Sequence, residues 1–142
     1  MEAMDHLKRL LERYPALVEL KNEISESYEL MKKSYENGGK LLVCGNGGSA
    51  ADSDHIVGEL MKGFKLARKP QVEFSKRLIN ENEELGSVLA ENLQGALPAI
   101  ALDGHLALST AYMNDCEPLL CFAQQVNGYG KAGDVFLGIS TS

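Results

Sequence analysis

The sequence lacks the features that mark several specialised classes of protein. It has no tryptophan, only four prolines and an odd number of cysteines, three, so neither a collagen-like chain nor a disulfide-stabilised scaffold is indicated. No apolar run approaches the ~20 residues that a membrane-spanning helix requires, and charges interrupt the apolar residues of the N-terminal segment. We therefore expect no membrane span, no signal peptide and a cytoplasmic location.

Basic residues are scarce relative to acidic ones. The chain has 14 Lys and Arg against 20 Asp and Glu, which gives a formal net charge of −6. An acidic surface repels nucleic-acid phosphates and anionic lipids, and no local basic patch offsets this charge. Neither nucleic acid nor a membrane surface is therefore expected as a partner.

What is present is typical of one globular domain. A length of 142 residues, with 44% hydrophobic and 24% charged residues, predicts a single domain over residues 1–142 with one core. Cys44, Cys116 and Cys121 lie in apolar segments and show no CxxC spacing. We expect all three to be reduced, buried packing residues without a redox or metal role.

Apolar residues recur at helical spacing near the N-terminus. A short apolar face ends before Pro15, and a longer stripe runs from Leu17 to Tyr35 and stops at the Gly38-Gly39 pair. This spacing predicts N-terminal helices over residues 1–38. The long stripe either covers its own domain or packs on a partner subunit, and we expect a dimer or tetramer.

Three short apolar runs predict buried strands at residues 40–44, 97–102 and 135–139, with helices at 49–62 and 106–127 between them. Ser49, with Asp52 three residues later, predicts a capping box at the first of these helices. The alternation indicates an α/β fold, a doubly wound parallel sheet with helices on both faces. Since the last strand leads straight to the end of the chain, we expect a shortened form of the domain.

Residues 68–97 do not fit this alternation of strands and helices. A basic, proline-containing stretch is followed by a polar run and then by apolar residues at helical spacing. We interpret this segment as an insertion into the domain.

A glycine-rich loop, Gly45-Asn46-Gly47-Gly48-Ser49, lies between the first predicted strand and the following helix. Backbone N–H groups, a serine hydroxyl and the positive end of a helix dipole suit an anion such as phosphate. The loop is neither GxGxxG nor a P-loop, so no nucleotide cofactor is expected. The alternative is a tight turn without a ligand.

A second polar loop follows the last predicted strand. Ser140, Thr141 and Ser142 come at its carboxyl end, the edge at which open α/β sheets bind ligands. Two hydroxyl-bearing loops at one edge can share one phosphate, although Ser and Thr also form ordinary turns there.

His55 and Glu59 are four residues apart on the helix that follows the glycine loop, so they share a face. Three interpretations are open: a surface hydrogen bond, a pair of metal ligands, or a general base with its neighbour, since a positioned carboxylate can move a proton between carbons.

Two stretches of the chain resemble the SIS (sugar isomerase) domain family, and within it the phosphoheptose isomerases. Residues 44–60 match the pattern C-G-N-G-G-S-x-x-D-x-x-H-x-x-x-E-L, residues 133–142 are similar to the family's second phosphate loop, and Asn114-Asp115 falls where the family has Asn-Asp. The family continues past Ser-Thr-Ser with a Gln and a His that complete its active site.

The resemblance implies a flavodoxin-like sheet, a homotetramer, and conversion of sedoheptulose 7-phosphate to D-glycero-D-manno-heptose 7-phosphate through an enediol. It implies that Glu59 is the base, with His55 beside it, and that some members bind zinc through the positions of these two residues. The substrate and its phosphate would be held by Asn46, Gly47, Gly48, Ser49, Asp103, Ser140, Thr141 and Ser142. Members of the family have an aspartate shortly after the second strand. Asp103 is the near match to it, whereas an alignment without gaps places His105 at that position.

A second function remains open on the same fold. Some members of the family, such as the replication-initiator-associating protein of bacteria, are non-catalytic modules that bind phosphosugars or other proteins. That relative lacks the catalytic pair, so His55 and Glu59 favour the enzyme, whereas the insertion favours the module.

Overall fold

A sheet of three parallel strands forms the centre of the structure, a computed structural model that describes residues 3–141. Strand β1 (Leu41–Gly45) lies between β2 (Ala99–Ala101) and β3 (Val135–Ile139). All five residues of β1 are buried, which explains its nearly continuous apolar sequence. This sheet confirms the predicted α/β class with parallel strands.

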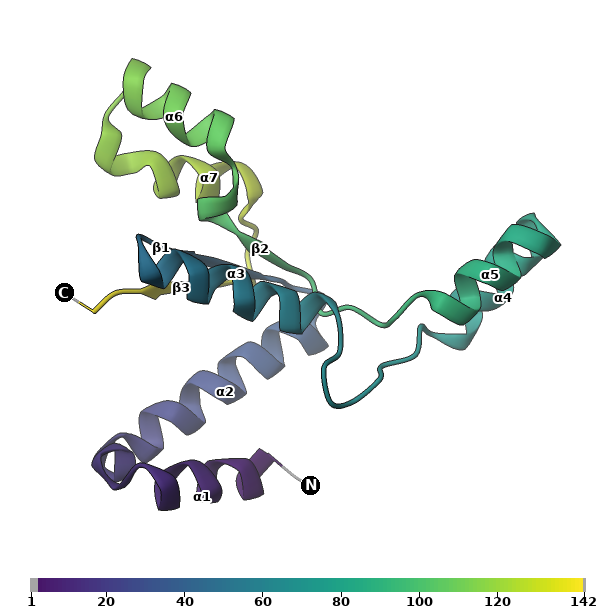
Figure 1. The fold of residues 1–142 in the computed structure, drawn as a ribbon, viewed down its shortest axis with the longest axis horizontal. Helices are drawn as coiled ribbons and strands as arrows, with labels where there is room; N and C mark the ends of the chain where they lie inside the picture. The colour runs from purple at the N-terminus through teal and green to yellow at the C-terminus, as the bar shows by residue number, and fades with distance from the viewer. Residues whose placement is uncertain (1–2, 142) are drawn as a thin grey trace.

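Helices cover both faces of the sheet (Figure 1). On one face, Leu41 and Val43 pack under α2 (Lys21–Glu36) and α3 (Gly48–Met61). On the opposite face, Leu42 and Cys44 pack under α7 (Cys121–Tyr129). Successive residues of β1 thus serve opposite layers, as the doubly wound arrangement requires.

The remaining elements are α1 (Ala3–Arg13), η1 (Pro15–Leu20), α4 (Val72–Glu81), α5 (Glu83–Asn92), η2 (Leu102–Gly104), α6 (Leu106–Asp115) and η3 (Pro118–Leu120). No helix in residues 3–141 is both long enough and apolar enough to cross a membrane.

The structure corrects two local predictions. Helix α3 begins at Gly48 with Gly47 as its N-cap and without a side-chain cap, so the capping box at Ser49 and Asp52 is wrong. Gly47 has φ 58° and ψ −121°, a conformation open to glycine, and this turn places Ser49 inside the first helical turn. Cys116 is exposed because it is the C-cap of α6, whereas Cys44 and Cys121 are buried as expected.

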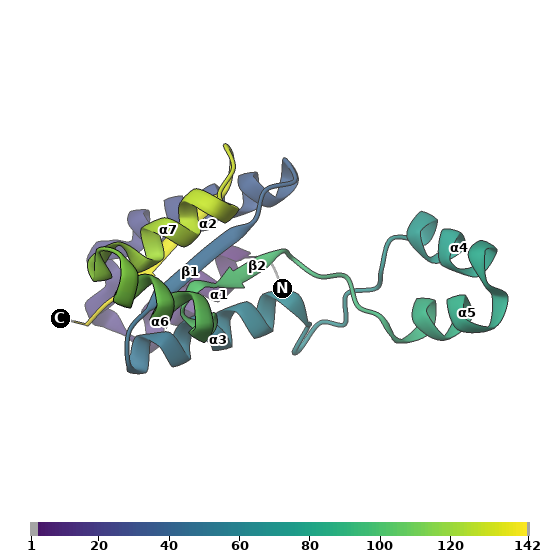
Figure 2. The same ribbon diagram turned by 90° about the horizontal axis from the view of Figure 1, so that it is seen from above.

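The segment predicted as an insertion contains a helical hairpin. Helices α4 and α5 pack against each other and project away from the sheet (Figures 1 and 2). Gly86 lies against the backbone of Leu78, where a Cβ atom would not fit, so the two helices approach closely at that point.

An ion pair joins the beginnings of β1 and β3. The carboxylate of Asp134 pairs with Nζ of Lys40 and accepts hydrogen bonds from the backbone N–H groups of Lys40, at 3.0 Å, and Lys131, at 2.7 Å. The hydrogen bond from the Lys40 side chain is the main reason that the pKa of Asp134 is lowered, despite an opposing contribution from burial.

This ion pair predicts a dependence of stability on pH. A lowered pKa stabilises the fold above about pH 3.9, the ordinary value for Asp, and the stabilisation is lost as the pH falls through the folded-state value. Asp134→Asn should lower the free energy of unfolding at pH 7 by about 1.5 kcal/mol and have a smaller effect at pH 2. Urea unfolding at the two pH values measures this; an equal loss at both would contradict the prediction.

Candidate functional site

The site is built around the loop that connects β1 to α3. The N–H of Ser49 donates to the carbonyl of Asn46 at 3.1 Å, and the N–H of Ala50 donates to the carbonyl of Gly47 at 3.2 Å, so the loop closes as a tight turn. A Cβ atom on Gly45 would lie 2.5 Å from the Ser49 carbonyl group, whereas one on Gly48 would meet no atom within 4 Å. Gly45 is thus required by packing, and Gly48 leaves one side of the loop open.

The two hydroxyl-bearing loops line one cavity. Strand β3 pairs directly with β1, so Gly45 lies opposite Ile139 and the loops leave the sheet side by side. The cavity between them has a volume of about 430 Å³, and its walls include Asn46, Ser49, Ser140 and Thr141. Ser142 lies outside the described residues. The arrangement offers two serine hydroxyls and a threonine hydroxyl to an anion at the carboxyl edge of the sheet.

A second cavity, of about 500 Å³, also borders the glycine loop. Gly45, Asn46 and Gly47 line it together with Asp103 from η2 and residues of α6, η3 and α7. The Oδ1 atom of Asp103 is buried and has no hydrogen-bond partner within the described part of the chain. Such an oxygen suits a hydroxyl group of a ligand, because buried acceptors are ordinarily satisfied.

The surroundings of Cys44 change the pKa of its thiol. Burial, and after it the negative charge of Asp103, raise the pKa of Cys44, so the thiol stays protonated at neutral pH. This supports the prediction that Cys44 packs without reactive chemistry.

Sequence reasoning missed Ser109 and Phe122. The hydroxyl of Ser109 in α6 is buried and has no hydrogen-bond partner among residues 3–141, and Ser109 lines the second cavity, as Asp103 does. Phe122 of α7 lines both cavities. No motif marks either residue, because their position depends on how α6 and α7 fold back over the sheet.

The structure does not bring His55 and Glu59 to these cavities. Both are exposed on α3, and neither lines the cavities beside the glycine loop. Glu59 lies roughly 16 Å along the helix from Gly48, from a rise of 1.5 Å per residue. Within a single chain, the two loops and the pair of His55 and Glu59 therefore lie in different surroundings.

The same pair does not form a zinc site by itself. Within residues 3–141 no group of three or more His, Cys, Asp and Glu side chains is placed to hold a metal ion. A zinc site has four ligands, of which at least three come from the protein, and His55 with Glu59 supplies two.

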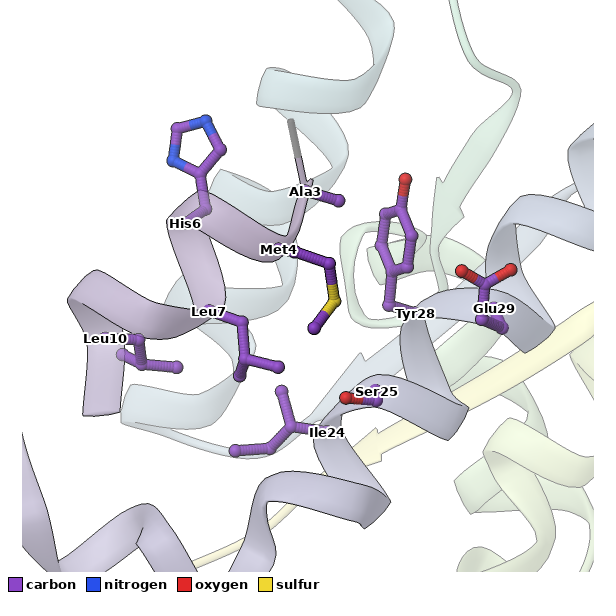
Figure 3. A pocket seen from close by; sticks show the side chains of 9 residues that line it. All are labelled: Ala3, Met4, His6, Leu7, Leu10, Ile24, Ser25, Tyr28 and Glu29. Atoms are coloured by element: carbon purple, nitrogen blue, oxygen red, sulfur yellow. The ribbon is translucent and has the colours of Figure 1, made fainter. Parts of the chain in front are cut away.

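A third, apolar cavity of about 370 Å³ lies between the N-terminal helices. Figure 3 shows Met4 and Leu7 of α1 facing Ile24 and Tyr28 of α2 across it. It offers apolar surface and little polar chemistry, which suits association more than catalysis.

Comparisons with known proteins agree with this arrangement of loops. Residues 4–95 match the SIS domain family. The chain is 38% identical to the phosphoheptose isomerase of Clostridium acetobutylicum over 120 residues, which cover 84% of this chain and 48% of that protein. It is 35% identical to the phosphoheptose isomerase of Helicobacter pylori over 135 residues, which cover 95% of this chain and 56% of that protein.

A solved structure has the same fold. The phosphoheptose isomerase of Neisseria gonorrhoeae superimposes with a TM-score of 0.61 at 32% identity, over 96% of this chain and 54% of that one. The chain thus spans about half the length of the relatives that it matches.

Proposed function

Because this chain belongs to the SIS domain family, we propose that it provides the phosphate-binding part of a phosphosugar isomerase. The substrate that we propose is sedoheptulose 7-phosphate, and the product is D-glycero-D-manno-heptose 7-phosphate. The observation that carries the proposal is the shared cavity of Asn46, Ser49, Ser140 and Thr141 at the carboxyl edge of the sheet. Relatives named phosphoheptose isomerases support the choice of substrate.

Under this proposal the residues of the two loops have separate tasks. The hydroxyls of Ser49, Ser140 and Thr141 hold the phosphate, and the backbone of Gly47 and Gly48 leaves room for the sugar. Ser142, the next residue in the sequence, is proposed for the phosphate set as well. Asp103 accepts a hydrogen bond from a sugar hydroxyl through its unsatisfied oxygen.

Glu59 is the proposed base. It removes a proton from C1 of the ketose, the C1–H electrons form the C1–C2 double bond, and the C2 carbonyl oxygen gains a proton to give the enediol. The C1 hydroxyl then loses its proton as C1 becomes the aldehyde carbon, and a proton is delivered to C2. His55, one turn before Glu59, is the proposed partner of this carboxylate.

Glu59 is exposed and lines neither cavity within the described part of the chain. We therefore propose that a second copy brings its α3 face to these loops. The apolar cavity between α1 and α2 supports association between copies of the chain. The exposed side chains of Val18, Leu20 and Leu30 support it as well. We propose a dimer or tetramer; a stable monomer of about 15 kDa at micromolar concentration would contradict this.

Phosphate should stabilise the chain through the shared cavity. A ligand that binds only the folded state at 100 times its dissociation constant adds about 2.7 kcal/mol to the free energy of unfolding. Ser49→Ala should reduce the rise in melting temperature that phosphate causes, because one donor is lost, whereas Ser27→Ala on the exposed face of α2 should not. A salt series corrects for the general effect of sulfate and phosphate on burial. An unchanged rise in Ser49→Ala would remove this hydroxyl from the ligand set.

A non-catalytic phosphosugar-binding module is the second candidate function. The separation of Glu59 from the cavities favours it, since binding needs only the loops. Incubation of the protein at full length with sedoheptulose 7-phosphate distinguishes the two: the enzyme gives the aldose, and the module binds the ketose without converting it.

A further inference from the structure

Glu59 lies in the last turn of α3, close to the end of the helix at Met61. The N–H of Lys62 donates to the carbonyl of Gly58 at 2.9 Å and is the last bond of the helical series. The carbonyls of Glu59 and Leu60 therefore need partners from outside the helix. A helix end without such partners frays, and a base in a frayed turn would lose the geometry that proton transfer needs.

The segments on either side of the α4–α5 hairpin supply these partners. One segment follows α3 and the other leads into β2 (Figure 1). From the first, the guanidinium of Arg68 donates to the carbonyls of Glu59, at 3.3 Å, and Leu60, at 2.6 Å. From the second, the N–H of Leu97 donates to the same Leu60 carbonyl at 2.9 Å. A cation at this end of a helix also interacts favourably with the helix dipole.

Arg68 is itself held in place. Its Nε–H donates to the carbonyl of Gly95 at 2.8 Å, and the N–H of Gly95 donates back to the carbonyl of Arg68 at 2.8 Å. The residue is half-buried. Burial raises the pKa of Tyr35 on α2, and the positive charge of Arg68 opposes this rise, so the guanidinium lies close to the domain rather than out in solvent.

The neighbouring basic residues do not share this role. Among the basic side chains from Lys62 to Arg77, that of Arg68 alone donates a hydrogen bond to α3 within residues 3–141. Lys76 pairs with Glu73 on its own helix, and Arg77 is exposed on α4. Arg77 therefore provides a matched control for substitution of Arg68.

We propose that Arg68 is a positioning residue for Glu59, which clamps the last turn of α3 in the place that proton transfer requires. The proposal rests on the proposed function, in which Glu59 is the base. It also gives the base of the inserted segment a task in the reaction. The phosphate-binding loop lies at the opposite end of α3, so the clamp should affect turnover much more than binding.

Kinetics of the protein at full length test the positioning role. Arg68→Gln should lower kcat by about 10–10²-fold with KM nearly constant, because small displacements of a reacting group cost rates of this order. Arg68→Lys, which keeps the charge but not the planar fork, should recover part of the loss. Arg77→Gln should change neither quantity.

A double variant shows whether Arg68 acts through Glu59. In the Glu59→Gln background, Arg68→Gln should lower turnover no further, because no base is left to position. A fall by the same factor in both backgrounds would show that Arg68 acts elsewhere and would overturn the proposal.

Hydrogen exchange measures the clamp without the reaction. Arg68→Gln should speed exchange of the amides of residues 59–62 by about tenfold or more, since bonds from a charged group to the helix end are lost. The amides of residues 52–56 should keep their rates, which also shows that the variant is folded, and Arg77→Gln should change neither set. Unchanged exchange at residues 59–62 would overturn the clamp.

Failure of this proposal differs from failure of the proposed function. Loss of turnover in Glu59→Gln together with full turnover in Arg68→Gln would leave Glu59 as the base and overturn the role of Arg68. Full turnover in Glu59→Gln, or no conversion by the unaltered protein, would remove the base and with it the positioning role.

Discussion

Replacing Glu59 by Gln in the protein at full length should lower the turnover of sedoheptulose 7-phosphate by about 10²–10⁴-fold while leaving its binding nearly unchanged. Gln keeps the shape of Glu and one acceptor oxygen but cannot accept a proton at neutral pH. The expected loss therefore lies in kcat, with KM almost constant. Steady-state kinetics and calorimetric binding measure the two quantities separately.

A surface role for Glu59 makes the opposite forecast. An exposed i, i+4 pair with His55 contributes no more than about 0.5 kcal/mol to stability, so its loss would leave turnover intact. Glu36→Gln, an exposed carboxylate on α2, is the matched control and should change neither quantity. Full turnover in Glu59→Gln would remove this residue from the mechanism.

The second large effect is expected at the glycine loop. Gly45→Ala should lower the free energy of unfolding by about 3 kcal/mol and abolish the stabilisation by phosphate, because the new Cβ forces the loop away from the backbone of Ser49. Gly48→Ala should change stability by less than about 0.5 kcal/mol, since its Cβ points into open space. Thermal unfolding with and without phosphate compares the two variants. Equal losses would show that packing at Gly45 does not shape the loop.

The sheet could be predicted from sequence because its signal is local. The run from Leu41 to Cys44 is apolar on both faces, and the structure buries all of it between two helical layers. The glycine and serine loops could be placed at one edge because the carboxyl ends of parallel strands meet there.

Features that depend on tertiary contacts could not be predicted. The capping box failed because Gly47 turns the chain one residue before the expected start of α3. Ser109 carries no sequence signal, because its buried hydroxyl reaches the second cavity only through the packing of α6. The separation of Glu59 from the loops likewise follows from the direction of α3, which the motif does not encode.

The proposed isomerase reaction is tested most directly by incubating the protein at full length with sedoheptulose 7-phosphate in deuterium oxide and following the sugar by NMR. An enediol intermediate with a carboxylate base predicts D-glycero-D-manno-heptose 7-phosphate that carries deuterium at C2, because the base exchanges its proton with solvent before returning it. Ketose that binds to the protein and is recovered unchanged, with no deuterium and no aldose, would contradict the proposed function.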